Sequence, residues 1–330
     1  MKIEGLISMT KLQDFYNYTS ENPQVSIWNQ LLLYSDYNVL KKTWLNHTEE
    51  EYIYVATSIN QAHEYFKASN GCSIKTRPLL LYYCFLNLTK ASLFLIEDKL
   101  PNSAHHGLGK PGINQDILKV TATSGGGLFK DLSTYFKFSY ADKTKFSFEQ
   151  LIKNIPELIY PIKAFFGLDS NLVYLDVKNY LSKGFEISLP EVLFNSSPSF
   201  KRFLEDFEKE ISNGNVFLTY HSKNQLNETE RVSEGREILK KYCQYSVLDY
   251  EYYFNVDENA IPIESSYYGA MFILSSIVRY YPTEISAFTI EKGESSAGWF
   301  ISQFCDIAAR VYPNLMMSAM ANKQLKYLNH

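Results

Sequence analysis

Two long apolar segments constrain the fold of this chain more than any other feature. The first begins at Arg77 and reads RPLLLYYCFLNLTKASLFLIE, and the second ends at Tyr281 and reads YYGAMFILSSIVRYY. Each is long enough for a helix, is apolar on nearly every side and carries few charges. Such helices need cover all round, and we expect these two to supply it to each other in one core.

The first segment is also long enough to cross a bilayer between Leu79 and Ile96. Asn87 and Lys90 oppose that interpretation, because a lysine in the middle of a span costs roughly 3 kcal/mol to insert. The flanking sequence has no second span and no strong basic collar. We therefore predict the central helix of a soluble bundle, with no membrane as partner.

Composition and charge are those of an ordinary globular chain. Its 330 residues are 45% hydrophobic, which is ample for a core. The formal net charge is −4 and the acids and bases are intermixed. This excludes a broad positive field for nucleic acid or an anionic membrane, although it leaves a local basic pocket open.

The cysteines and the N-terminus indicate the compartment. No C-x-x-C pair occurs and no histidine stands at ligand spacing, so we expect neither a metal site nor a cofactor. The N-terminal residues lack the apolar run of a signal peptide, which predicts a cytoplasmic protein. We expect reduced, mostly buried thiols at Cys72, Cys84, Cys243 and Cys305.

Helical periodicity runs through the first third of the chain. Residues Gln24–Trp44 predict one or two short helices, and Glu49–Ala68 predicts an amphipathic helix that Gly71 ends. A proline is harmless in a first helical turn, so the third helix starts near Pro78 and runs to about Glu97.

The middle third changes to strand-prone sequence. Lys119–Thr123 predicts a strand and Gly125–Gly127 a turn. Leu128–Phe138 then returns as the second strand of a β-hairpin, which is the simpler interpretation, or as a short helix. Further predicted elements are helical sequence over Phe146–Phe166, strands over Leu172–Val177 and Asn215–Tyr220, a charged helix over Ser199–Ile211 and β-prone sequence over Tyr242–Phe254.

The last third is helical again, and the order of elements defines the fold class. From Ser265 onward we expect one helix ended by Pro282 and another over Ser296–Val311. Helices, then strands, then helices, without βαβ alternation, predict an α+β fold that is predominantly α-helical. The helical core would come from the N- and C-terminal thirds with a β-containing middle, divided as residues 1–115, 116–262 and 263–330.

The familiar catalytic and nucleotide-binding motifs are absent. Gly107–Lys110 resembles a phosphate loop, but the spacing needs a glycine at Ala104 and a hydroxyl residue at Pro111. Gly125–Gly127 fits a turn better than a dinucleotide fingerprint. No arginine has a histidine at the spacing used by HEPN ribonucleases.

Polar side chains form a stripe on each apolar helix. Tyr83, Asn87 and Lys90 are spaced i, i+4, i+7 and share one face. The same spacing on the second helix joins Tyr268, Phe272, Ser275 and Arg279. If the two helices are neighbours, their stripes converge into a small basic pocket for phosphate or carboxylate. The candidate ligand-binding residues are therefore Arg77, Asn87, Lys90, His106, Ser275 and Arg279.

A purely structural role for the same residues is the alternative. Asn87 can link helices, and Arg279 can satisfy helix carbonyls or pair with Glu284. His106 together with Gly107 can shape a turn between two elements.

Three segments of the chain resemble the YaaC-like family of bacterial proteins. They are P-L-L-x-Y-Y-x-x-x-N-L-x-K-A over Pro78–Ala91, H-G-L at His106–Leu108 and L-S-x-x-x-R-Y-x-P over Leu274–Pro282. A tryptophan that commonly follows the last motif is replaced by Glu284 and Ile285. The resemblance covers most of the chain and implies a bacterial cytoplasmic protein with a shared fold. It transfers no catalytic residue.

Two classes of function follow from these patterns. The first is a binding component of a bacterial multi-gene system such as antiviral defence, with a nucleotide or other phosphate-bearing ligand and a protein partner encoded nearby. The second is a hydrolase or nuclease that acts on a phosphorylated substrate, with His106 as acid or base and Arg77, Lys90 and Arg279 holding charge. The sequence lacks the catalytic motifs considered above, and this favours the first class. The sequence is also compatible with a homo-oligomer.

Overall fold

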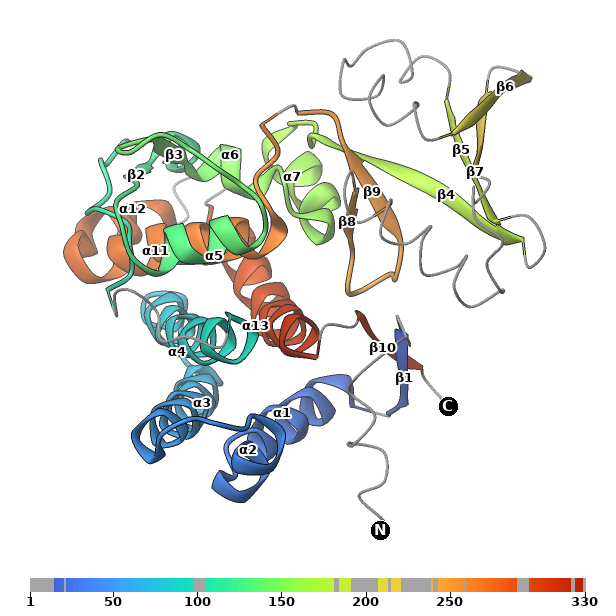
Figure 1. Cartoon of the computed structure of the whole chain (residues 1–330). Helices are drawn as coiled ribbons and strands as arrows, with labels where there is room; N and C mark the ends of the chain where they lie inside the picture. The colour runs from blue at the N-terminus through green and yellow to red at the C-terminus, as the bar shows by residue number, and fades with distance from the viewer. Residues whose placement is uncertain are drawn as a thin grey trace.

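The computed structural model describes residues 15–20, 22–97, 105–180, 184–190, 207–212, 215–220, 239, 243–257, 259–289, 297–321 and 324–328. Within these residues the fold is α+β and mostly helical, as predicted (Figure 1). The helices are α1 (Pro23–Leu33), α2 (Tyr37–Thr43), α3 (Glu49–Ser69), α4 (Arg77–Glu97), α5 (Leu128–Tyr135), α6 (Phe148–Ile152), α7 (Ile159–Phe166), α11 (Ile263–Tyr280), α12 (Pro282–Thr289) and α13 (Gly298–Met320).

The strands form three sheets among the described residues. A six-stranded antiparallel sheet has the order β6-β7-β5-β4-β9-β8. Two strands near the chain ends, β1 and β10, pair in parallel, and β2 pairs with β3 antiparallel. Their bounds are β1 (Phe15–Thr19), β2 (Thr121–Thr123), β3 (Lys145–Ser147), β4 (Leu172–Tyr180), β5 (Gly184–Pro190), β6 (Glu208–Ser212), β7 (Asn215–Tyr220), β8 (Cys243–Tyr245), β9 (Tyr252–Asn255) and β10 (Gln324–Leu328).

Local sequence explains where the first helices begin and end. Asn22 caps α1, whose first residue is a proline. A capping box joins Thr48 and Glu51 at the start of α3, since each side chain accepts from the other's backbone N–H. Gly71 follows α3 with φ +83°, a conformation that glycine adopts without strain. The predicted helices of the first third are confirmed.

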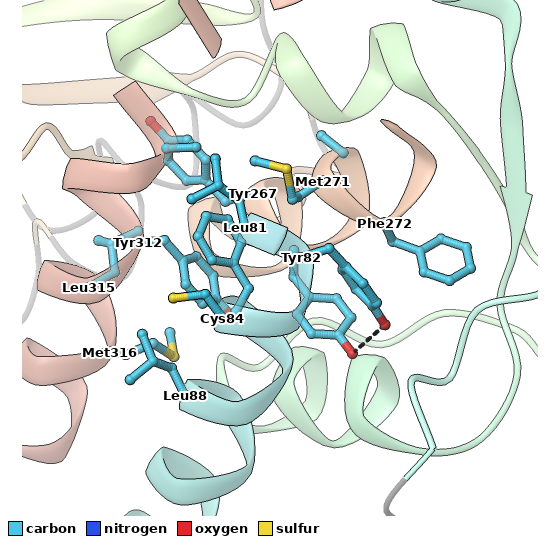
Figure 2. Packing of buried hydrophobic residues seen from close by; sticks show 14 of the residues in the cluster. Leu81, Tyr82, Cys84, Leu88, Tyr267, Met271, Phe272, Tyr312, Leu315 and Met316 are labelled. Carbon is cyan, nitrogen blue, oxygen red and sulfur yellow. Dashed lines mark hydrogen bonds between the residues drawn. The ribbon is translucent and has the colours of Figure 1, made fainter. Parts of the chain in front are cut away.

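The central helix α4 is enclosed by α3, α11 and α13. The Tyr82 side chain of α4 is buried, and its ring packs against the Phe272 ring of α11 with 5.5 Å between centroids. On the α13 side, the Phe85 ring stacks on the Tyr312 ring at 4.0 Å. Figure 2 shows α4 side chains between those of α11 and α13. The expectation that the two apolar helices cover each other is therefore confirmed.

The same helix α4 is long and apolar enough to span a membrane, and it is the one described helix that is. Most of its apolar stretch is buried by the helices around it. This is how the core helix of a soluble protein is placed, and it agrees with the expectation drawn from Lys90.

The six-stranded sheet has a small apolar core of its own, separate from the helical core. Buried side chains from four of its strands meet there. They include Leu175, Ile187, Val216, Leu218 and Phe254. Figure 1 shows β5, β6 and β7 at the end of the sheet away from α4. The division into residues 1–115, 116–262 and 263–330 stays a prediction.

The predicted β-hairpin after residue 119 is wrong, and its alternative is right. Residues 128–135 form the helix α5, and β2 pairs with β3 instead. The apolar residues of this segment recur at helical spacing, and Leu128, Phe129 and Leu132 are buried by it. Tertiary burial of that face decided between strand and helix.

Two further element predictions need correction. Residues 208–211 belong to strand β6, not to a charged helix, and the earlier part of Ser199–Ile211 lies outside the described residues. The last predicted helix does not stop at Val311, because α13 continues through Pro313 to Met320. Residues 314–317 of this extension are buried, and that burial offsets the cost of a proline within a helix.

The four cysteines are free, as predicted. Cys84 and Cys305 are buried, and burial raises the pKa of both thiols. Cys72 and Cys243 are partly exposed, so the expected burial holds for two of the four.

Candidate functional site

Two glycine-containing loops interlock beside the N-terminus of α5. The backbone N–H groups of Leu128 and Phe129 donate to the carbonyls of His105 and His106, at 3.0 and 3.2 Å. The N–H of Gly125 donates to the carbonyl of Gly107 at 2.8 Å. These bonds occupy helix N–H groups that would otherwise be available to an anion. The glycine run therefore anchors the His106 loop and is not a phosphate loop.

Gly107 is required by this interlocked geometry. Its φ is +82°, and a β-carbon there would lie 2.8 Å from the carbonyl oxygen of Gly126 and 2.9 Å from the nitrogen of Phe129. Both neighbours are backbone atoms, so neither can move aside cheaply. The H-G-L motif thus places the His106 backbone with little freedom.

His106 is held against α11 in a neutral form. Its carbonyl also accepts from the Tyr268 hydroxyl at 3.2 Å, and its ring centroid lies 5.0 Å from that of Phe272. Its Nδ1 accepts from the N–H of Leu108 at 3.2 Å, which places the proton of the neutral ring on Nε2. Burial lowers the pKa of His106, and the positive charge of Arg279 lowers it further.

Arg279, at the C-terminal end of α11, is held by aromatic side chains. Its Nη1 donates to the Tyr83 hydroxyl at 3.1 Å, and its guanidinium carbon lies 4.3 Å from the Tyr280 ring centroid. The buried Nε atom has no acceptor. In the described part of the chain Arg279 forms no ion pair, and the Glu284 carboxylate instead accepts from Thr283.

Lys110 joins this site from the loop that follows the H-G-L motif. Its Nζ lies 4.7 Å from the ring centroid of Tyr281 and 5.3 Å from that of Tyr280. The loop is fixed to α11 because the Tyr281 hydroxyl donates to the carbonyl of Pro111 at 3.2 Å. Lys110 has no carboxylate partner among the residues that the structure describes. We call this site the arginine–tyrosine cluster: Tyr83, His106, Lys110, Arg279, Tyr280 and Tyr281.

The other predicted site residues are placed differently. The Asn87 amide donates to the carbonyl of Tyr83 within α4 at 3.0 Å, and the Ser275 hydroxyl donates to the carbonyl of Phe272 at 2.9 Å. Lys90 is partly buried, and burial lowers its pKa. Arg77 is turned to α13, where its Nη1 lies 2.5 Å from the carboxylate of Asp306.

The structure thus associates His106 with Arg279. It adds Tyr83, which lay on the predicted stripe but was not a candidate ligand-binding residue, and three residues that sequence reasoning did not select. Lys110, Tyr280 and Tyr281 were missed because the first lies in a loop between motifs and the others read as the amphipathic edge of a helix. The sequence did contain one signal for this site. Arg279 is followed directly by Tyr280 and Tyr281 at the end of an apolar helix, so a cation and two aromatic rings lie next to each other at the edge of the core.

Two pairs of buried hydroxyls lie against each other between the core helices. The Tyr82 and Tyr268 hydroxyls lie 3.4 Å apart, and the Thr89 and Tyr312 hydroxyls lie 2.6 Å apart. Burial raises the pKa of these tyrosines, so they are neutral donors and acceptors at physiological pH. Among the described residues, no group of three His, Cys, Asp or Glu side chains is placed to hold a metal ion.

The fold and the site define a class of protein: a mostly helical α+β protein with a cationic aromatic site at one end of its core. The chain matches the family described as YaaC-like Protein over residues 21–320 and belongs to that family. Neither the curated proteins nor the solved structures gave a match. At the position where the family pattern commonly has a tryptophan, Ile285 is buried in the helical core.

Proposed function

We propose that this protein is a binding component that recognises an anionic, phosphate-bearing ligand at the arginine–tyrosine cluster. The observation that carries the proposal is the environment of the Arg279 side chain. Its guanidinium is oriented by a hydroxyl and a ring, and its charge meets no carboxylate among the described residues. Arginine presents a planar fork that suits phosphate. The buried Nε atoms of Arg77 and Arg279 both have no acceptor, so what distinguishes Arg279 is that it has no carboxylate partner among the described residues.

Binding is favoured over catalysis by the protonation of His106. A general base needs a free lone pair on the nitrogen that faces the substrate, and a general acid needs a proton that it gives up near neutral pH. The Leu108 N–H occupies the Nδ1 lone pair, and the lowered pKa makes the imidazolium scarce at pH 7. The neutral ring instead offers an Nε2–H donor to a ligand, so the hydrolase alternative has less support.

The wider setting of the proposal is a cytoplasmic bacterial protein in a multi-gene system such as antiviral defence. This part rests on resemblance between family members and not on any residue of the cluster. Genes that recur beside this one across genomes would support it, and a lone housekeeping locus would count against it.

Native mass spectrometry of the freshly purified protein tests the binding proposal. We expect a phosphate-bearing mass on the wild type that is lost in Arg279→Ala, with the fraction folded matched by circular dichroism. Arg310→Ala is the matched control, because Arg310 is an exposed arginine on the core helix α13. A mass that persists in Arg279→Ala would overturn the proposal. So would an apo wild type that also fails to bind added nucleotide or inorganic phosphate.

A further inference from the structure

The arginine–tyrosine cluster holds two cations on one ring. The Arg279 guanidinium carbon lies 4.3 Å from the Tyr280 ring centroid, and the Lys110 ammonium lies 5.3 Å from the same centroid. Tyr280 is 46% exposed, so the two cations meet at the surface and are not sealed in the core. Two positive charges beside the same ring repel each other, and the ring offsets only part of that repulsion.

Neither cation has a carboxylate partner among the residues that the structure describes. The Lys110 ammonium lies over the Tyr280 and Tyr281 rings, and Arg279 contacts the Tyr83 hydroxyl and the Tyr280 ring. Other lysines of the described chain do pair with a carboxylate: Lys67, Lys119, Lys130, Lys153 and Lys163.

From this arrangement we infer that Lys110 and Arg279 form a two-point clamp that selects a doubly charged terminal phosphate, a phosphate monoester, over a singly charged phosphodiester or carboxylate. The inference rests on the proposed function, since it assigns the charge and ester class of the ligand at the same site. A monoester carries close to two negative charges above its second pKa near 6, whereas a diester carries one. Only the first neutralises both cations.

The same geometry assigns separate roles to the members of the clamp. Arg279 is oriented by Tyr83 and Tyr280, so it supplies directed hydrogen bonds to any phosphate. Lys110 is exposed on a loop and supplies a point charge, which rewards the second negative charge of the ligand. Removal of Arg279 should therefore abolish binding, and removal of Lys110 should abolish the preference for the monoester.

Isothermal titration calorimetry near pH 8 tests this with four probes, because monoesters are fully doubly charged at about that pH. The probes are adenosine 5′-monophosphate, adenosine 3′,5′-cyclic monophosphate, and one short single-stranded oligonucleotide with either a 5′-phosphate or a 5′-hydroxyl. We expect each terminal monoester to bind at least about tenfold more tightly than its partner without one. The ratio between the two monoesters distinguishes a free nucleotide from a nucleic-acid end as the source.

Lys110→Gln is the decisive variant, and Lys41→Gln is its matched control. Lys41 also lies over a tyrosine ring, 5.8 Å from the Tyr37 centroid, on the short helix α2. Lys110→Gln should reduce the monoester preference to near one while Lys41→Gln keeps it. Equal binding of monoester and diester by the wild type, or a preference that survives Lys110→Gln, overturns the clamp. Absence of all anion binding, or binding indifferent to Arg279→Ala, overturns the proposed function itself.

Discussion

Two seams of the helical core, between α4 and α13 and between α4 and α11, each contain an arginine. The two arginines differ in their partners. At the α4–α13 seam, Arg77 pairs with the Asp306 carboxylate, and the Thr89 and Tyr312 hydroxyls bond each other deeper in the core. At the α4–α11 seam, the Tyr82 and Tyr268 hydroxyls likewise lie against each other in the interior. At its outer end, however, Arg279 contacts the Tyr83 hydroxyl and the Tyr280 ring and has no carboxylate partner among the described residues. The difference indicates that polarity in a buried helix is structural where partners are internal and available to a ligand where they are not.

The loop beside the second seam should be the most sensitive point. Gly107→Ala places a β-carbon against two backbone atoms at a positive φ, and we expect it to lower the free energy of unfolding by about 3 kcal/mol or more. Gly71→Ala is the control, because Gly71 has nearly the same φ with nothing within 4 Å of its β-carbon. It should cost about 1 kcal/mol. Urea unfolding of both variants measures this, and equal losses would show that the interlock is unimportant.

A partly buried carboxyl at the start of α11 should make stability depend on pH. Burial raises the pKa of Glu264 to about 7, whereas the unfolded value is near 4.5. The folded protein therefore binds more protons between these values, and stability should fall by on the order of 2 kcal/mol as pH rises through that window. Glu264→Gln should reduce this dependence on pH, and Glu149→Gln, at a partly exposed carboxylate, should not. Thermal unfolding measured from pH 5 to 8 checks this prediction. If stability depends on pH in Glu264→Gln as steeply as in the wild type, the assignment is contradicted.

The interior hydrogen bonds of the first seam should have a smaller effect. Tyr312→Phe removes the hydroxyl that bonds Thr89, while Thr89 keeps its bond to the Phe85 carbonyl at 2.8 Å. We expect a loss of about 1 kcal/mol in stability and no change in anion affinity, because the seam uses its polar groups internally. Urea unfolding together with phosphate titration of this variant checks both parts. Reduced anion affinity at full folding would blur the distinction between the seams.

The ion pair of the first seam should contribute least. The Asp306 side chain is 54% exposed, so its pairing with Arg77 is screened by water and salt. Asp306→Asn should cost less than about 1 kcal/mol, and the cost should shrink in high salt. A larger loss of stability that does not change with salt, measured by urea unfolding, would contradict this prediction.

Much of the helical core was predictable from sequence, because burial of apolar periodicity decides it. The helices of the first third followed from apolar periodicity, with Gly71 and Pro78 marking two of their boundaries, and the pairing of α4 with α11 followed from their nearly uncharged surfaces. Segments whose apolar residues fit two periods were not predictable. Leu128–Phe138 was read as a returning strand, and the extension of α13 past Pro313 required neighbours that sequence does not display.

The candidate site was predictable only in part, for a related reason. Spacing placed Arg279 on one helix face, and the H-G-L motif marked His106, but the partners of each depend on tertiary contacts. Asn87 and Ser275 donate to carbonyls of their own helices, a choice that periodicity cannot reveal. Lys110 reaches the site through a loop path that is fixed by the Tyr281 hydroxyl.

Arginine Nε–H resonances measured by NMR during a phosphate titration test the difference between the two seams most directly. The chain has six arginines, so the spectrum is small, and Arg279→Lys and Arg77→Lys assign the two signals that matter. We predict that inorganic phosphate shifts the Arg279 Nε–H signal in a saturable manner and leaves that of Arg77 in place. An Arg279 signal that does not move, or one that moves no more than that of Arg77, would contradict the account.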